Sequence, residues 1–375
     1  MVTVSDPAAR VINAAHNRIL RYHNDREQVA TKQRPNGGVL YHYTTAEGLK
    51  GIIENEELWS TSAYYLNDSA EILYGYRLLD VALEEWLKQA TPLEDSISRG
   101  LAESLRHYFG HDALERNVIT PIYLTCFCEE GNLLSQWRAY GSSGGYSIGF
   151  KVPAEGIVYG LVPGPRVYTA RCVKVEYDRD KQVRRVLEIL DSVLPILDEQ
   201  EVKEAVRSID PISPLGFSQL SRIISEMLVE ESIGFKDVAF AVEKEWRFVV
   251  RSRELLKQGI DDGTHTNLPI HFRTARGRLT PFVKLVPSKA AMPLVGDGEK
   301  LPIASVRCGP AGDRISATMA VRYLLDGKRI SIGSCGSFGD IAGFLSVHTS
   351  PSFDDRIRQY ASVLAASRPR LRQNA

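Results

Sequence analysis

Hydrophobic and polar residues alternate in several short stretches of the chain, a period typical of β-strands with one buried face. In GVLYHYTT, residues 38–45, the odd positions Val39 to Tyr43 face one way and the even positions Leu40 to Thr44 face the other. The same criteria predict further strands at 58–62, 118–128, 146–152, 167–177, 245–250, 279–286 and 303–308.

Apolar residues at helical spacing occur between these strands. Thr45 is placed to cap a helix whose inner face carries Leu49, Ile52 and Ile53, and a long helix is expected to start near Ser69. Further helices are predicted at 133–141, across much of 179–232, and at 315–325. The order of elements lacks the steady alternation of a doubly wound sheet, so we expect an α+β fold with a mixed, mostly antiparallel sheet.

This pattern suggests three parts of the chain. Residues 1–37 are expected to form a helix and a linker, and 38–355 a single α+β domain with a helical insertion at about 179–232. Residues 356–375 are expected to form a C-terminal helix and a basic tail.

Composition narrows the functional classes. The 375 residues include 46 basic and 46 acidic side chains, so net charge gives no general attraction to nucleic acid. No apolar run approaches the roughly 20 residues of a membrane helix, and the start lacks a signal-peptide core. Five cysteines are too few for a disulfide framework. We therefore expect a cytoplasmic protein without a membrane segment.

Several common catalytic motifs are absent from the sequence. It contains no GxGxxG, P-loop, HExxH or GxSxG string. Cys126 and Cys128 form a CxC on a predicted strand, but no second cysteine or histidine pair lies at zinc spacing. We interpret them as small core residues and predict no metal site.

Histidine and hydroxyl groups come together at the end of the first predicted strand. His42 and Thr44 share one face there, at the turn into a helix. A lone histidine on a strand is more often structural than functional. The alternative is a site for a sugar or phosphate, where Tyr43 also supplies backbone groups to a planar amide.

Two further polar stretches carry candidate binding residues. In LWSTSAYYLND, Ser60 and Thr61 supply hydroxyls and Tyr65 offers an aromatic ring, although the end of this stretch is also a good turn sequence. In LLSQWRAYG, three consecutive residues could clamp a ligand, because an arginine can bind phosphate and a tryptophan ring can stack on a base. These residues are Gln136, Trp137 and Arg138. A packed tryptophan with solvated neighbours explains that stretch equally well.

Glu245 is the strongest carboxylate candidate. It precedes an aromatic strand and shares a face with Arg247, and burial of an unpaired carboxylate there would be costly. It either forms a structural ion pair with arginine or stabilises a positively charged, oxocarbenium-like ribose carbon during glycosyl transfer. Glu243, two residues earlier, is the rival for that role.

Several strings, taken in order, resemble a bacterial family of uncharacterised proteins, domain of unknown function 2971. The similarity runs from about residue 38 to about 355. It rests on LYHYTTAEGLKGIIENEELWSTSAYYLND with Glu71 after it, on LLSQWRAYGSSGGYSIGF, on FKDVAFAVEKEWRFVV, and more weakly on VRCGPAGD.

The opening YHYTTAEGLKGII also resembles, more distantly, the first conserved block of ADP-ribosyltransferases of the His-Tyr-Glu type. That resemblance implies a split sheet, with His42, the Tyr43 backbone and Thr44 positioning NAD, and Glu245 stabilising the ribosyl cation. The tyrosine that stacks on nicotinamide in that family corresponds either to Tyr65 or to Tyr146.

The leading hypothesis is therefore an ADP-ribosyltransferase-like enzyme that uses NAD as substrate. Arg138 or Arg247 would meet the pyrophosphate, unless Arg247 pairs with Glu245. The acceptor would be a protein, a nucleic acid or water, and a role as a toxin or in phage defence is suggested by analogy alone. One alternative is a non-catalytic module that binds or senses a nucleotide. A second is a metal-dependent nuclease built on Asp68, Glu71 and Glu245.

Overall fold

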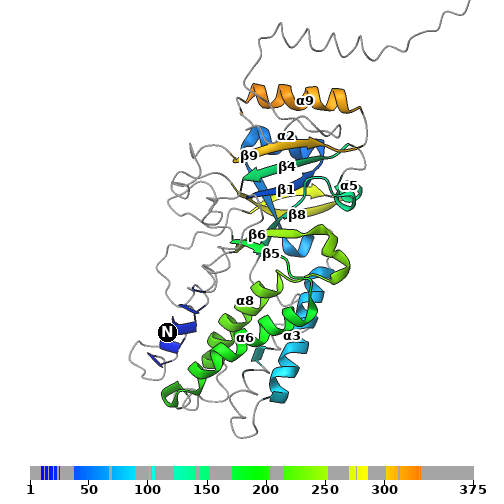
Figure 1. Ribbon diagram of the computed structural model, residues 1–375. Helices are drawn as coiled ribbons and strands as arrows, with labels where there is room; N and C mark the ends of the chain where they lie inside the picture. Colours follow the sequence, from blue (N-terminus) through cyan, green and yellow to red (C-terminus); the bar gives the residue numbers. More distant parts are fainter. Residues whose placement is uncertain are drawn as a thin grey trace, which may run out of the picture.

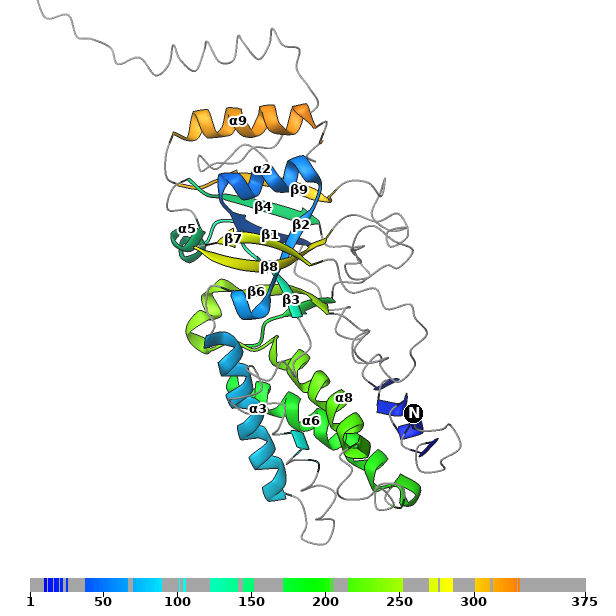
Figure 2. The same ribbon diagram turned by 180° about the vertical axis from the view of Figure 1, so that it is seen from behind.

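The fold is described here from a computed structural model, shown from two sides in Figures 1 and 2. It describes residues 38–66, 70–89, 122–140, 144–151, 171–202, 215–251, 270–285 and 301–330, apart from 276, 311, 312 and 329, with scattered residues at 10–25, 101–105 and 204. The C-terminal segment 356–375 lies outside the described residues, as does most of the predicted N-terminal linker.

Within these residues, nine strands form one sheet, and each pairing between strands is antiparallel. The strands are β1 (Val39–Thr44), β2 (Leu58–Ser62), β3 (Ile122–Cys128), β4 (Tyr146–Lys151), β5 (Arg171–Lys174), β6 (Glu245–Arg251), β7 (His271–Ala275), β8 (Arg278–Leu285) and β9 (Ile303–Cys308). The predicted α+β class is confirmed, and the pairings are more uniform than the mixed sheet we expected.

Six α-helices accompany the sheet in the same residues. They are α2 (Ala46–Asn55), α3 (Ala70–Gln89), α5 (Leu134–Tyr140), α6 (Arg179–Asp198), α8 (Leu215–Ser232) and α9 (Arg314–Gly327), with short 3-10 helices η1 (Ala63–Tyr65) and η3 (Val238–Glu243). Thr45 caps α2 as predicted, because its hydroxyl accepts a hydrogen bond from the backbone N–H of Gly48 at 3.2 Å.

Strand β3 organises the sheet because it pairs with three other strands. Along one edge it pairs with β6 over its full length, from Ile122 to Cys128. Along the other edge it pairs with β2 at Tyr123 and Leu124, and with β1 only at Cys128. Neither β1 nor β2 pairs with the residues of β3 between Leu124 and Cys128. We call this interval, where β1 and β2 part, the split.

The two faces of the sheet differ in chemistry. One face carries Leu40, Phe127, Ile148 and Phe248 and packs with the apolar sides of α2 and α9 into a core, so we call it the apolar face. The opposite face carries Cys126, Cys128, Glu245 and Arg247 from β3 and β6, and Tyr41, Thr61 and Arg307 from neighbouring strands. We call it the polar face.

A second hydrophobic core lies among α3, α6 and α8, which form a helical layer on the far side of β5 and β6 from α9 (Figures 1 and 2). Ile122, Leu124 and Val249 of the sheet contribute to this core, and so do Ala15 and Ile19 from the N-terminal residues. Helices α6 and α8 occupy the segment that we predicted as a helical insertion.

Candidate functional site

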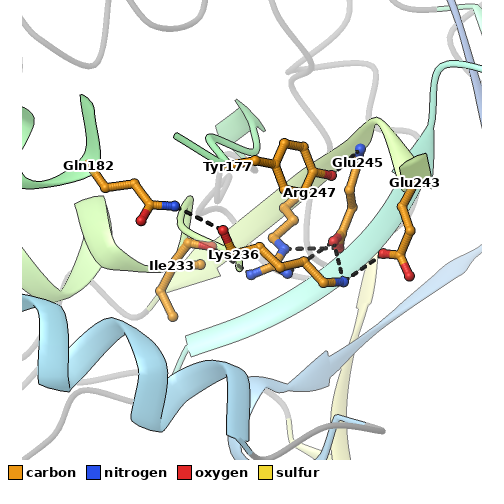
Figure 3. A network of polar contacts seen from close by, with 7 residues as sticks. All are labelled: Tyr177, Gln182, Ile233, Lys236, Glu243, Glu245 and Arg247. Carbon is orange, nitrogen blue, oxygen red and sulfur yellow. Dashed lines mark hydrogen bonds and ion pairs between the residues drawn. The ribbon is translucent and has the colours of Figure 1, made fainter. Parts of the chain in front are cut away.

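Glu245 is the first residue of β6, and its side chain is buried with 5% of its surface exposed. Arg247 lies two residues along, on the same face, and binds the carboxylate with both arms of its guanidinium. Its Nε donates to Oε1 at 2.9 Å, and a terminal nitrogen donates to Oε2 at 3.0 Å. Lys236 also donates to Oε2, at 2.9 Å (Figure 3). Both carboxylate oxygens are therefore occupied.

The surrounding groups extend this arrangement into a balanced buried network. Lys236 also donates to Glu243 at 2.6 Å, so two cations meet two carboxylates. The remaining guanidinium nitrogen of Arg247 donates to the backbone carbonyl of Ile233 at 2.7 Å. The hydroxyl of Tyr177 accepts a hydrogen bond from the backbone N–H of Glu245 at 2.9 Å. These contacts form a structural ion network that joins β6 to the helical layer.

The network fixes the charge of Glu245. Burial raises the pKa of its carboxyl, but Arg247 and Lys236 lower it further than burial raises it, to about 2. The carboxylate is therefore ionised at all physiological pH values. Both of its oxygens accept hydrogen bonds from cations of the protein itself. Of the two interpretations of Glu245, the geometry favours the structural ion pair.

His42 lies on the apolar face of β1, as the alternation predicted. Its ring lies 5.6 Å from that of Phe127, and its strand partner in β4 is Ile148. Nδ1 lies 2.9 Å from the backbone carbonyl oxygen of Cys126. Because a carbonyl can only accept, Nδ1 must carry the hydrogen, and the neutral ring then keeps an acceptor at Nε2.

This hydrogen bond follows from the split. The carbonyl of Cys126 belongs to the interval of β3 that pairs with neither β1 nor β2, and the His42 ring reaches it there. Buried carbonyl groups need hydrogen-bond donors, and the histidine supplies one. Burial lowers the pKa of His42, the hydrogen bond to Cys126 opposes this, and the charge of Arg273 lowers it further. His42 therefore has a structural task at the split.

His42 and Glu245 do not share a site. Glu245 pairs across the strands with Cys128, on the polar face, whereas His42 lies with Phe127 on the apolar face. Successive side chains of a strand point to opposite sides, so a sheet separates the two groups. The resemblance implied that both groups act on one ribose, and their places on opposite faces of the sheet do not support this. The hydroxyl-bearing residue Thr44 lies on the same face as His42 and packs against Gly48 of α2.

The predicted hydroxyls of β2 divide between the two faces. Ser60 is buried on the apolar face and hydrogen-bonds to Thr125 at 2.6 Å. Thr61, on the polar face, accepts a hydrogen bond from Arg273 at 2.9 Å. Arg273 lies on β7, a strand that the sequence analysis did not predict. The alternation in HFRTA before the glycine turn at Gly277, where φ is +72°, is the signal that could have found it.

Two arginine–aromatic pairs flank the split on the polar face. On the β2 side the guanidinium of Arg273 lies 5.6 Å from the ring centroid of Trp59, which in turn stacks on Phe282 at 4.3 Å. On the β1 side the guanidinium of Arg307 lies 5.1 Å from the ring centroid of Tyr41. None of these pairs was predicted as a site from the sequence.

The predicted clamp on α5 has a structural explanation. Tyr43 donates its hydroxyl hydrogen to the carbonyl of Glu130 and accepts from the backbone N–H of Leu133, both at 2.8 Å. Its ring meets Trp137 edge-on at 4.8 Å, and Gln136 is buried beside it. These contacts hold the loop between β3 and α5.

The other predicted residues lie apart from this cluster. Arg138 is exposed on α5, and Tyr65 is 49% exposed on η1. Tyr146 pairs with Thr44 across the strands and packs at the margin of the apolar core. Neither tyrosine is brought to Glu245, so neither completes the arrangement that the resemblance implied.

Metal chemistry has no support in the described part of the chain, which contains no group of three or more histidine, cysteine or acidic side chains able to hold an ion. Asp68 and the side chain of Glu71, on which the nuclease alternative rests, lie outside the described residues. Among described residues, no helix combines the length and apolar character needed to span a bilayer.

Part of the chain is similar to the model of a known family. No curated protein and no solved structure matches the chain. Residues 136–248, which run from α5 to β6 and include the Glu245 network, match the model of a family described as protein of unknown function (DUF2971).

Proposed function

We propose that this protein binds a nucleotide on the polar face of the sheet at the split, as a binding or sensing module. The observation that carries the proposal is the pair of arginine–aromatic contacts, one on each side of the split. A guanidinium suits phosphate oxygens, and aromatic rings beside it suit a base. NAD is the first nucleotide to test, because the YHYTT block resembles the NAD-binding block of ADP-ribosyltransferases.

Glycines shape one wall of this site. A Cβ at Gly131 would lie 2.5 Å from a ring carbon of Tyr41, and a Cβ at Gly149 would lie 3.0 Å from the same ring. The first distance is shorter than real side chains show, and the second is tight enough that the ring would have to shift. The glycines therefore allow the Tyr41 ring to lie flat against the backbone, beneath Arg307.

ADP-ribosyl transfer would require Glu245 and His42 to act in a way that their present contacts do not favour. Glu245 would have to exchange its contacts with Arg247 and Lys236 for a ribose hydroxyl, and each lost contact is a charge-assisted hydrogen bond in a buried place. His42 would act from the other face of the sheet. The geometry favours binding without this chemistry.

Calorimetric titration with NAD tests the proposal, beside an assay for released nicotinamide. We expect binding by the wild-type protein, weaker binding by Thr61→Val, and no nicotinamide release. Thr274→Val is the matched control, because Thr274 is exposed on β7, on the other side of β8 from Thr61. Equal affinity of the Thr61 and control variants would argue against the split as the site, and release that disappears in Glu245→Gln would establish the transferase instead.

A further inference from the structure

Arg273 differs from three other cations on or beside the polar face. Arg247 and Lys236 are paired with Glu245, and Lys284 lies 3.0 Å from Glu57. Among the described residues, no carboxylate lies within ion-pair distance of Arg273. Its contacts are the Thr61 hydroxyl and the Trp59 ring, both uncharged.

The guanidinium is also incompletely hydrogen-bonded. Among the residues that the structure describes, the buried Nε of Arg273 has no hydrogen-bond partner, while one terminal nitrogen donates to Thr61. A half-buried cation without a counter-charge is unfavourable, and burial lowers the pKa of Arg273 accordingly. Its charge also acts on His42, whose pKa it lowers, so the positive field extends into the split.

We propose that Arg273 is the phosphate-binding residue of this site, and that the ligand is therefore a phosphorylated nucleoside. This inference rests on the proposed function and names the part of the ligand that is recognised. An arginine presents a planar fork of N–H donors that matches two phosphate oxygens. Thr61, beside it, has a hydroxyl that can donate to a third oxygen while it accepts from the arginine.

Trp59 holds the side chain of Arg273 in one place. Its ring lies between Phe282 and the guanidinium and is 37% exposed, so it restricts the arginine without covering it. Its indole N–H is bound to Glu57 at 2.8 Å, which fixes the ring. Arg273 is thus held in place before the anion arrives, and less ordering entropy is lost on binding.

Calorimetric titrations with adenosine, ADP and inorganic pyrophosphate test the inference. We expect ADP to bind the wild-type protein about 10- to 100-fold more tightly than adenosine, the range of a charge-assisted hydrogen-bond pair. Arg273→Gln should lose this advantage and leave adenosine affinity unchanged. Arg278→Gln, an exposed arginine on β8, should bind ADP like the wild type.

The outcomes separate this inference from the function on which it rests. Equal affinity for adenosine and ADP, or full ADP affinity in Arg273→Gln, overturns the role of Arg273 and leaves nucleotide binding standing. Failure of adenosine, ADP, pyrophosphate and NAD to bind the folded wild type overturns both. If Arg273→Gln does not fold, Arg273→Lys keeps the charge without the fork, and undiminished ADP affinity in that variant also overturns the inference.

Discussion

Replacing Glu245 by glutamine tests whether this residue holds the fold together. The change keeps the size of the side chain but removes the charge that faces Arg247 and Lys236. Glu243 would then be the remaining carboxylate of the network, opposite two cations. A buried cation that loses its counter-charge is among the costly outcomes of a single substitution.

The size of the effect follows from the pKa of the carboxyl. A fall from the ordinary value of 4.5 to about 2 corresponds to about 3 kcal/mol of stabilisation of the ionised form in the folded protein. The folded pKa lies below the unfolded one. This contribution is therefore fully present above pH 4.5 and is lost as the pH falls from about 4.5 to about 2. Glu245→Gln should lower the free energy of unfolding by about 3 kcal/mol at pH 7.

Urea unfolding, followed by tryptophan fluorescence, measures the loss. Glu243→Gln is the matched control: its side chain is 20% exposed, more than that of Glu245, and it binds Lys236 alone of the two network cations, so we expect a loss of about 1 kcal/mol. The excess loss in Glu245→Gln should shrink toward pH 2. A Glu245→Gln protein as stable as the wild type would refute the structural role, since catalytic carboxylates are commonly replaced without loss of stability.

Two other substitution sets test the split and the helix beside it. His42→Phe should cost about 1–3 kcal/mol in urea unfolding, because the Cys126 carbonyl loses its donor. In the wild type the lowered pKa of His42 means that stability is lost as the pH falls below 6.5; this loss should be smaller in the variant, and an unchanged pH profile would contradict the assignment. On α2, Gly51→Ala should raise stability by about 0.5–1 kcal/mol, because its Cβ meets open space. Gly48→Ala should be the less stable of the two by thermal unfolding, because its Cβ would lie 1.9 Å from the Thr44 hydroxyl; the reverse order would show that Thr44 packs differently.

Local patterns predicted much of the sheet. The alternation within the predicted strand 245–250 placed Glu245 and Arg247 on one face of β6, as the structure has them. Strong strand and helix periods are set by neighbours in sequence, so they can be detected without knowledge of the fold. The alternation also placed His42 on the same face of β1 as Leu40, as the structure has it, but it did not predict the contacts of the ring.

Contacts across the sheet could not be predicted in this way. Whether His42 and Glu245 meet depends on the pairing of β1, β3 and β6, which no local pattern reports. Lys236 lies nine residues before Glu245 and reaches it only because a 3-10 helix lies between them. Arg273 is brought to Thr61 from 212 residues away, by a hairpin whose strands are short. Such sites follow from strand order and register.

We propose that the split on the polar face binds a nucleotide and that Glu245 takes no part in chemistry there. Titration of NAD into the wild-type protein in a calorimeter tests it most directly. We expect saturable binding at one site, with NAD recovered intact at the end of the titration. Absence of binding, or recovery of nicotinamide and ADP-ribose in place of NAD, would contradict it.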